Sequence, residues 1–217
     1  MKAFIFDLDG TLLDSLEDLA DAGNAMLTHA DYPQHPVAAY RHFVGDGLEM
    51  LVRRALPAGE EARLGAENFA ALVQYTRDVY GKNWQVKSRP YPGVVEALRA
   101  LADKGHELGV LSNKPHHWTV DIIGHFFPTL RFSVVRGALP GVPHKPDPAP
   151  AQEVLRMLDM PASVCAFVGD SNVDMLTAVR TGMVPVGVSW GFRDVEELRN
   201  AGARYIVYAP AELTMLA

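Results

Sequence analysis

Short runs of apolar and β-branched residues recur along the chain, and most of them are separated by segments with helical periodicity. Such runs occur at 3–6, 107–111, 132–135, 164–168, 184–188 and 205–208. The helical spacing between them is clearest in residues 93–105 and 149–159. Continuous apolar strands that alternate with helices are typical of a parallel sheet that is covered on both faces. The pattern therefore predicts an α/β fold.

The pattern changes between residues 16 and 85. Leu16, Leu19, Met26 and Leu27 recur at helical spacing, and the later segments continue in the same way without a convincing strand. A block of about seventy residues is far too long for an ordinary loop between a strand and a helix. We therefore expect residues 1–15 and 86–217 to form a Rossmann-like parallel sheet with helices on both faces. Residues 16–85 are expected to form an inserted all-helical cap.

The composition excludes some classes of partner. The 217 residues include 20 basic and 26 acidic side chains, which gives a formal net charge of −6. This balance argues against a sequence-independent grip on nucleic acid or on an anionic membrane. No apolar run approaches the length needed to span a membrane. Cys165 is the only cysteine, so an intrachain disulfide is impossible and we expect a cytoplasmic protein.

The first apolar run ends on two aspartates, Asp7 and Asp9, in the stretch FIFDLDGTLLDS. Two carboxylates this close repel each other, which costs free energy unless a cation or a proton lies between them. Magnesium prefers one or two carboxylates together with waters and substrate phosphate oxygens. The alternative interpretation is a simple turn, because Asp-Gly is a common turn sequence. The stretch alone leaves both interpretations open.

Other polar residues also follow apolar runs. Ser112 and Asn113 follow residues 107–111, Lys145 lies in a loop before a helix, and Asp170 and Asp174 follow residues 164–168. Ligands of open α/β sheets bind outside the carboxyl ends of the strands, so these residues are predicted to meet at one edge.

These residue types suit phosphoryl transfer. A carboxylate can attack a phosphoryl group, and a second carboxylate can protonate the leaving oxygen and later activate water. Ser112 can donate to phosphoryl oxygens, Lys145 can balance their charge, and Asp170 with Mg²⁺ can neutralise the remainder.

The motifs DLDGT, LSNK, KPDP and GDSNVD occur in the order and approximate spacing of the haloacid dehalogenase (HAD) superfamily. The position of the helical insertion resembles the phosphoglycolate-phosphatase-like branch of that superfamily. The resemblance spans nearly the whole chain, and four ordered motifs are far more specific than one.

The resemblance implies a role for each matching residue. Asp7 is the expected nucleophile and Asp9 the general acid/base, while Ser112, the Asn113 backbone and Lys145 contact the phosphoryl group. Mg²⁺ is expected on the Asp7 carboxylate, the Asp9 backbone carbonyl and the Asp170 carboxylate. Asp174 is expected to contribute through water or by orienting the site.

Two further segments have open interpretations. Gly45, Asp46 and Gly47 precede a helix in the cap, and we expect this loop to reach the leaving group of the substrate because glycines allow close approach to an anion. Arg53 and Arg54 are interpreted as a solvated helix face. Residues 190–193 are interpreted as a packed loop, a substrate contact or a dimer surface.

The main hypothesis is a Mg²⁺-dependent phosphatase that acts on a small phosphorylated metabolite through an aspartyl phosphate, as a monomer or homodimer. The resemblance favours 2-phosphoglycolate. A pyrophosphatase and a sugar phosphomutase are the nearest alternatives. A phosphorylatable switch that resembles a response-regulator receiver is the alternative from another class, as is a binding module that uses the cap as a clamp.

Overall fold

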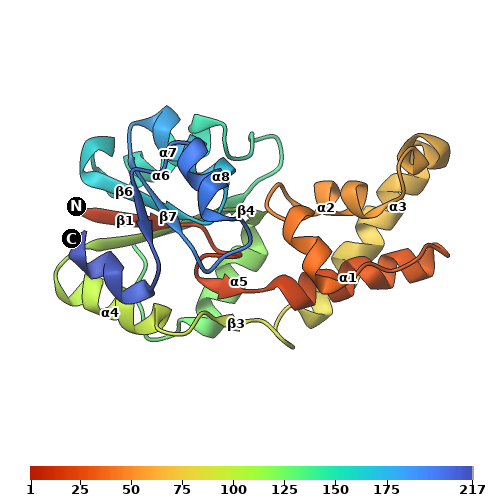
Figure 1. Ribbon diagram of the computed structural model, residues 1–217, viewed down its shortest axis with the longest axis horizontal. Coiled ribbons are helices and arrows are strands. Elements are labelled where there is room, and N and C mark those ends of the chain that lie inside the picture. The colour runs from red at the N-terminus through yellow and green to blue at the C-terminus, as the bar shows by residue number, and fades with distance from the viewer. Residues whose placement is uncertain (217) are drawn as a thin grey trace. The chain divides into compact units, whose positions relative to one another are not determined.

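A computed structural model describes residues 1–216 of the chain. The chain divides into two compact units, one made of 1–14 with the chain from Pro90 onward, and one made of Ser15–Arg89. The first unit, the sheet unit, contains a six-stranded sheet with helices, and the second, the helical unit, consists mainly of helices (Figure 1). The predicted α/β class with a Rossmann-like parallel sheet is confirmed.

All six strands of the main sheet are parallel, in the order β5-β4-β1-β6-β7-β8. They are β1 (Ala3–Phe6), β4 (Glu107–Pro115), β5 (Val134–Ala138), β6 (Cys165–Gly169), β7 (Val184–Val188) and β8 (Tyr205–Val207). A separate two-stranded sheet, β2 (Leu13–Asp14) with β3 (Arg89–Pro90), lies where the chain leaves the sheet unit and returns to it.

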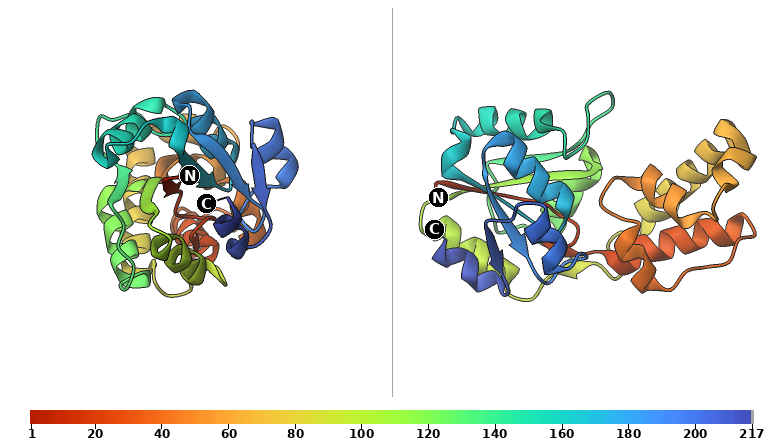
Figure 2. Two further views of the ribbon diagram at one scale, coloured as in Figure 1. Left: turned by 90° about the vertical axis from the view of Figure 1, so that its left-hand side faces the viewer. Right: turned by 45° about the horizontal axis from the view of Figure 1, so that its top comes forward.

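Helices cover both faces of the main sheet. Figures 1 and 2 show α4 and α5 on one face and α6 and α7 on the other. The helices and 3₁₀ turns of the sheet unit are α4 (Val94–Asp103), α5 (His116–Phe126), α6 (Pro148–Leu158), η2 (Ala162–Val164), α7 (Asn172–Thr181), α8 (Val195–Asn200) and η3 (Pro210–Met215). Because both faces are covered, the central strands β1, β6 and β7 are buried along their length and form continuous apolar runs in the sequence.

Alternate residues of each strand face opposite helical layers. Ala3 and Ile5 of β1 lie in one core cluster with Cys165 and Phe167 of β6. The same cluster takes in apolar residues of α6 and α7, namely Ala151, Val154, Leu155 and Ala178. Burial raises the pKa of the Cys165 thiol, which suits a packed core side chain better than a nucleophile.

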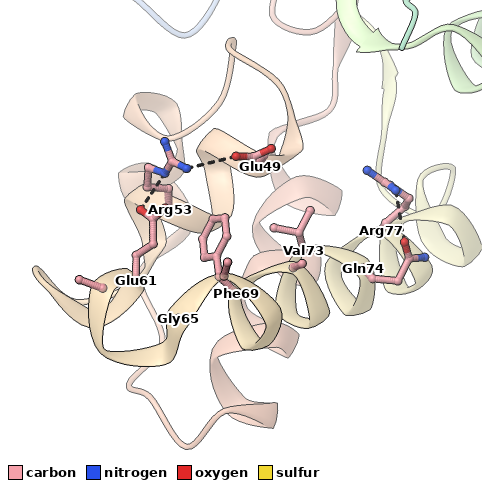
Figure 3. A pocket seen from close by; sticks show the side chains of 11 residues that line it. Glu49, Arg53, Glu61, Gly65, Phe69, Val73, Gln74 and Arg77 are labelled. Carbon is pink, nitrogen blue, oxygen red and sulfur yellow. Dashed lines mark hydrogen bonds and ion pairs between the residues drawn. The ribbon is translucent and has the colours of Figure 1, made fainter. Parts of the chain in front are cut away.

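The helical unit has a core of its own. It contains α1 (Leu16–His29), η1 (Val37–His42), α2 (Leu48–Ala55) and α3 (Glu60–Asn83), and Met26, Val52 and Phe69 contribute buried side chains from the three helices. Gly65 has φ 75° and ψ 166°, so α3 is two helices joined across a kink. Residues of α2 and α3 line a pocket at this kink (Figure 3).

The second boundary between the units falls at Arg89 and Pro90, four residues after the expected boundary at 85 and 86. The reason is Asp18 of α1, a buried carboxylate that accepts hydrogen bonds from the backbone N–H groups of Lys87 and Ser88. The Ser88 hydroxyl donates to the same carboxylate at 2.7 Å. These bonds fix residues 87 and 88 to the helical unit.

Candidate active site

The site lies at the carboxyl ends of three neighbouring strands. β1 is paired with β4 on one side and with β6 on the other, so β4 and β5 extend the sheet in one direction and β6, β7 and β8 extend it in the opposite direction. Such a topological switch point is the usual ligand site of an open α/β sheet. Asp7 follows β1, Ser112 lies near the end of β4, and Asp170 follows β6.

Lys145 links two of the predicted acidic residues. Its Nζ lies 3.0 Å from Asp7 Oδ1 and 2.7 Å from Asp174 Oδ1, and all three side chains are nearly inaccessible to solvent. Burial alone would lower the pKa of Lys145, but the carboxylates of Asp174 and Asp7 outweigh burial and raise it. The lysine is therefore a permanent positive charge beside Asp7.

Two sets of hydrogen bonds hold Lys145 and its partner Asp174 in place. Asp174 is the third residue of α7, where its Oδ2 accepts from the Ser171 N–H and hydroxyl while Ser171 caps the helix in return. Asn113 fixes the backbone of Lys145, because its amide donates to the Lys145 carbonyl at 3.1 Å and its oxygen accepts from the Lys145 N–H at 2.8 Å. Asp174 is therefore a partner of Lys145 as well as an acid at a helix N-terminus.

Asp170 is held by groups from two other segments. The Thr11 hydroxyl donates to its Oδ1 at 3.1 Å, and the Phe192 N–H donates to its Oδ2 at 2.8 Å. A Cβ on Gly191 would lie 2.2 Å from the Cβ of Asp170, so only glycine allows this loop to pass so close. The contacts of Gly191 and Phe192 with Asp170 are those of a packed loop, which is one of the interpretations of residues 190–193.

The acidic cluster is electrostatically crowded. Asp7, Asp170 and Asp174 are buried, and one oxygen of each lies within 4.8 Å of the others. Burial raises the pKa of Asp7 to about 7, with Lys145 opposing this shift and Asp174 adding to it. Burial, Asp174 and Asp7 together raise the pKa of Asp170 to about 8. The cluster therefore resists carrying its full negative charge.

The residues present fit a divalent cation. The four acids of the site and the two lysines that pair with them, Lys145 and Lys114, leave a formal charge of −2 in a buried region. A cation with two positive charges balances this excess. Carboxylate oxygens are the ligands that Mg²⁺ prefers, and Mg²⁺ needs only one or two of them.

Asp9 has a partner that the sequence analysis did not assign. Lys114 Nζ lies 2.7 Å from each oxygen of Asp9, and its side chain is 4% exposed. Lys114 belongs to the LSNK motif, but the expected strand ended at residue 111. In the structure β4 continues to Pro115. Strand alternation could not have placed Lys114, because the pairing of β4 with β5 is irregular between Leu111 and Pro115; the available signal was its position two residues after Ser112 in the same motif.

The structure brings together all the predicted site residues of the sheet unit. Asp7, Asp174 and Lys145 are in direct contact, Asp170 joins their cluster, and Asn113 is bonded to the backbone of Lys145. Ser112 is buried, and its Oγ accepts from the Lys114 N–H at 3.2 Å. Their catalytic and metal-binding roles stay predictions.

Gly45, Asp46 and Gly47 belong to the helical unit. Gly45 and Gly47 have φ values of 112° and 90°, and Gly47 caps the N-terminus of α2. Asp46 accepts a hydrogen bond from Arg54 at 2.5 Å. This contact gives Arg54 a partner, so it is more than a solvated side chain of α2.

Arg53 is exposed on α2, as expected for a solvated helix face, and it also has partners. It is paired with Glu49 at 3.1 Å and with Glu61 at 2.8 Å, and it lies over the Phe69 ring in the wall of the pocket (Figure 3). At this end of the pocket one arginine is shared by two glutamates, which leaves a formal charge of −1. Among residues 1–216, no helix is both long enough and apolar enough to cross a membrane.

Comparison with known proteins gives a consistent result. The family model described as haloacid dehalogenase-like hydrolase matches residues 4–188. The chain is 36% identical over 202 residues to a phosphoglycolate phosphatase of Psychrobacter arcticus, covering 92% of this chain and 88% of that protein. It is 37% identical over 199 residues to a phosphoglycolate phosphatase of Pseudomonas fluorescens, covering 88% and 70%.

A solved structure resembles the whole chain. A protein of Haemophilus somnus, described as a predicted phosphoglycolate phosphatase, superposes with a TM-score of 0.90 at 31% sequence identity. The match covers 100% of this chain and 97% of that one.

Proposed function

Since the chain belongs to the family of haloacid dehalogenase-like hydrolases and is a phosphatase, we propose that it hydrolyses a small phosphorylated metabolite with Asp7 as nucleophile and Mg²⁺ as cofactor. The observation that carries this proposal is the buried acidic cluster at the end of β1, where Lys145 contacts Asp7 and the formal charge is −2. A turn of the chain has no need for such a cluster, whereas attack on a phosphoryl group does.

The first step forms a bond between an Asp7 oxygen and phosphorus while the ester bond from phosphorus to the leaving oxygen breaks. Asp9 gives its proton to that oxygen, so the product leaves as an alcohol. In the second step water attacks the phosphorus of the aspartyl phosphate, Asp9 takes a proton from this water, and the Asp7 carboxylate is released with inorganic phosphate. Two displacements thus replace one difficult hydrolysis.

Two neighbouring residues serve the transferred group. Lys145 balances negative charge on Asp7 and on the phosphoryl oxygens, and its contact with Asp174 and its raised pKa support a constant positive charge. Ser112 donates its hydroxyl to a phosphoryl oxygen, with the Asn113 backbone beside it. The side chain of Asn113 has a further part, because it holds the backbone of Lys145.

The Asp7 and Asp170 carboxylates and the Asp9 backbone carbonyl would hold Mg²⁺, with Asp174 acting through water or by orienting Lys145. When bound, the ion neutralises negative charge on the phosphoryl group and lowers the repulsion between the carboxylates. Thr11 and the Phe192 N–H orient Asp170 for this purpose.

2-Phosphoglycolate is the proposed substrate, because the relatives with 36% and 37% identity are named for it. We propose that residues 15–89 act as a cap and that the loop of Gly45, Asp46 and Gly47 contacts the leaving group. The positive φ values of both glycines and the bond from Arg54 to Asp46 support a loop of defined shape. A monomer or homodimer in the cytoplasm is the setting we propose.

The test is phosphate release from purified protein with Mg²⁺, measured on 2-phosphoglycolate, pyrophosphate, sugar phosphates and 4-nitrophenyl phosphate. We expect 2-phosphoglycolate to give the highest kcat/KM and Asp7→Asn to lower it at least about a thousandfold. Asp103→Asn, an exposed acid on α4, is the matched control and should change nothing. Pyrophosphate as best substrate, or transfer between sugar hydroxyls, would replace only the substrate proposal.

Absence of turnover would contradict the proposal as a whole. A stable phosphoryl group on the protein without phosphate release would point to a receiver-like switch. Release that Asp7→Asn leaves unchanged would remove Asp7 from the mechanism.

A further inference from the structure

Lys114 is a buried lysine that the proposed mechanism does not use. It lies near the end of β4, 105 residues from Asp9 in sequence, and its ammonium group contacts both carboxylate oxygens of Asp9 at 2.7 Å. Removing a lysine from water is costly unless its charge is paired and hydrogen-bonded. Two short contacts to one carboxylate supply that pairing.

The backbone around Lys114 is fixed on both sides. Its N–H donates to the Ser112 hydroxyl at 3.2 Å, and its carbonyl accepts from the Thr119 hydroxyl at 3.2 Å. A Cβ on Gly137 of β5 would lie 2.6 Å from the same carbonyl oxygen, so the neighbouring strand packs tightly against it. The backbone that carries the Lys114 side chain is therefore fixed in position relative to its neighbours.

The two buried lysines of the site divide the acids between them. Lys145 contacts Asp7 and Asp174, whereas Lys114 contacts Asp9. Lys145 thus pairs with the proposed nucleophile and with Asp174 of the acidic cluster, whereas Lys114 pairs with the proposed general acid/base. This division separates the expected effects of removing either lysine.

We propose that Lys114 is a positioning residue for Asp9: its two-point contact holds the carboxyl group of the general acid/base in the orientation that proton transfer requires. The inference rests on the proposed function. The proton leaves the Asp9 carboxyl for the ester oxygen in the first step and returns from water in the second, while the Lys114 ammonium keeps its protons throughout. Because proton transfer needs hydrogen-bond geometry, a freely rotating Asp9 would be slower in both steps.

The leaving group distinguishes this role from others. An alkoxide is a poor leaving group and needs the proton of Asp9, whereas 4-nitrophenolate departs with little help. Removal of a residue that acts through Asp9 therefore slows an alkyl monoester more than an aryl one. A residue that contacts the phosphoryl group slows both alike, and a residue that only supports the fold lowers both through loss of folded protein.

The experiment measures kcat/KM of Lys114→Met on 4-nitrophenyl phosphate and on the alkyl monoester that the wild type hydrolyses fastest. We expect a loss of about tenfold or more on the alkyl ester and less than about threefold on the aryl ester. Lys114→Arg, which keeps a cation that can donate to both carboxylate oxygens, should retain more of the alkyl rate than Lys114→Met. Lys145→Met should reduce both rates alike, and Lys104→Met, at an exposed lysine that caps the C-terminus of α4, should reduce neither.

If Lys114→Met does not fold, Lys114→Gln keeps one donor for Asp9 and should show a smaller shift in the same direction. Equal losses on the two esters, or no loss on either, would overturn the role of Lys114 while the proposed function stands. A wild type without turnover on any substrate would overturn the proposed function first, and the inference with it.

Discussion

Buried acids in the two units of this protein have opposite environments. Asp18 in the helical unit accepts hydrogen bonds from three donors, the N–H groups of Lys87 and Ser88 and the Ser88 hydroxyl. Asp7 and Asp170 in the sheet unit are instead crowded by each other and by Asp174, and burial raises the pKa of both. The satisfied acid stabilises the fold, whereas the crowded acids cost stability. Such local conflict is expected at functional sites.

The largest expected difference between the two kinds of buried acid is in their contribution to the free energy of unfolding. Replacing Asp18 with alanine should lower the free energy of unfolding by about 2–3 kcal/mol, because the buried Ser88 N–H and the part-buried Lys87 N–H lose their acceptor. Asp7→Asn, measured with a chelator present, should leave this free energy unchanged or raise it, because one source of repulsion disappears. Urea unfolding of both variants checks the difference. A larger loss for Asp7→Asn than for Asp18→Ala would reverse the comparison.

A smaller effect is expected where a neutral group supports the crowded acids. Thr11→Val removes the hydroxyl that donates to Asp170, so the Mg²⁺ concentration for half-maximal activity should rise about tenfold. Titration of activity with Mg²⁺ measures this shift. Thr28→Val, an exposed threonine on α1, is the matched control. An unchanged Mg²⁺ requirement would show that Asp170 needs no support from Thr11.

The smallest expected effect is the pH dependence of the protein's stability. Burial and neighbouring carboxylates raise the pKa of Asp7 to about 7 and the pKa of Asp170 to about 8 in the folded protein, above the ordinary aspartate value of 3.8. Their contribution to stability is therefore present at low pH and is lost as the pH rises from about 4 to about 8.

Mg²⁺ should counteract this loss. It competes with these protons and binds only the folded site, so it should raise Tm by about 2–4 °C near pH 8 and by less near pH 5. Thermal melts with Mg²⁺ and with a chelator, at both pH values, check this. A Mg²⁺ effect that is larger near pH 5 would contradict the raised pKa values.

Much of the fold followed from local patterns. The apolar runs at 3–6 and 184–188 coincide with β1 and β7, because strands buried on both faces leave a continuous signal. The gathering of Asp7, Lys145 and Asp170 was also predictable, since the carboxyl ends of neighbouring parallel strands meet at one edge.

The missing parts depend on contacts between segments that are distant in sequence. The continuation of β4 to Pro115, past the expected end at residue 111, puts Lys114 in a strand and directs it to Asp9. The hydrogen bonds between Asn113 and the Lys145 backbone join positions 32 residues apart. The hydrogen bond from the Ser88 N–H to Asp18 joins positions 70 residues apart. Periodicity and composition carry no information about such pairs.

The central claim is that the phosphoryl group passes through Asp7 on its way to water. The most direct test is the stereochemical course at phosphorus, measured with a thiophosphate ester that carries sulfur and two oxygen isotopes and is hydrolysed in water labelled with the third, so that the released thiophosphate is chiral. Each in-line displacement inverts the configuration, so two steps through Asp7 predict net retention. Net inversion would mean that water attacks the substrate directly and would contradict the account.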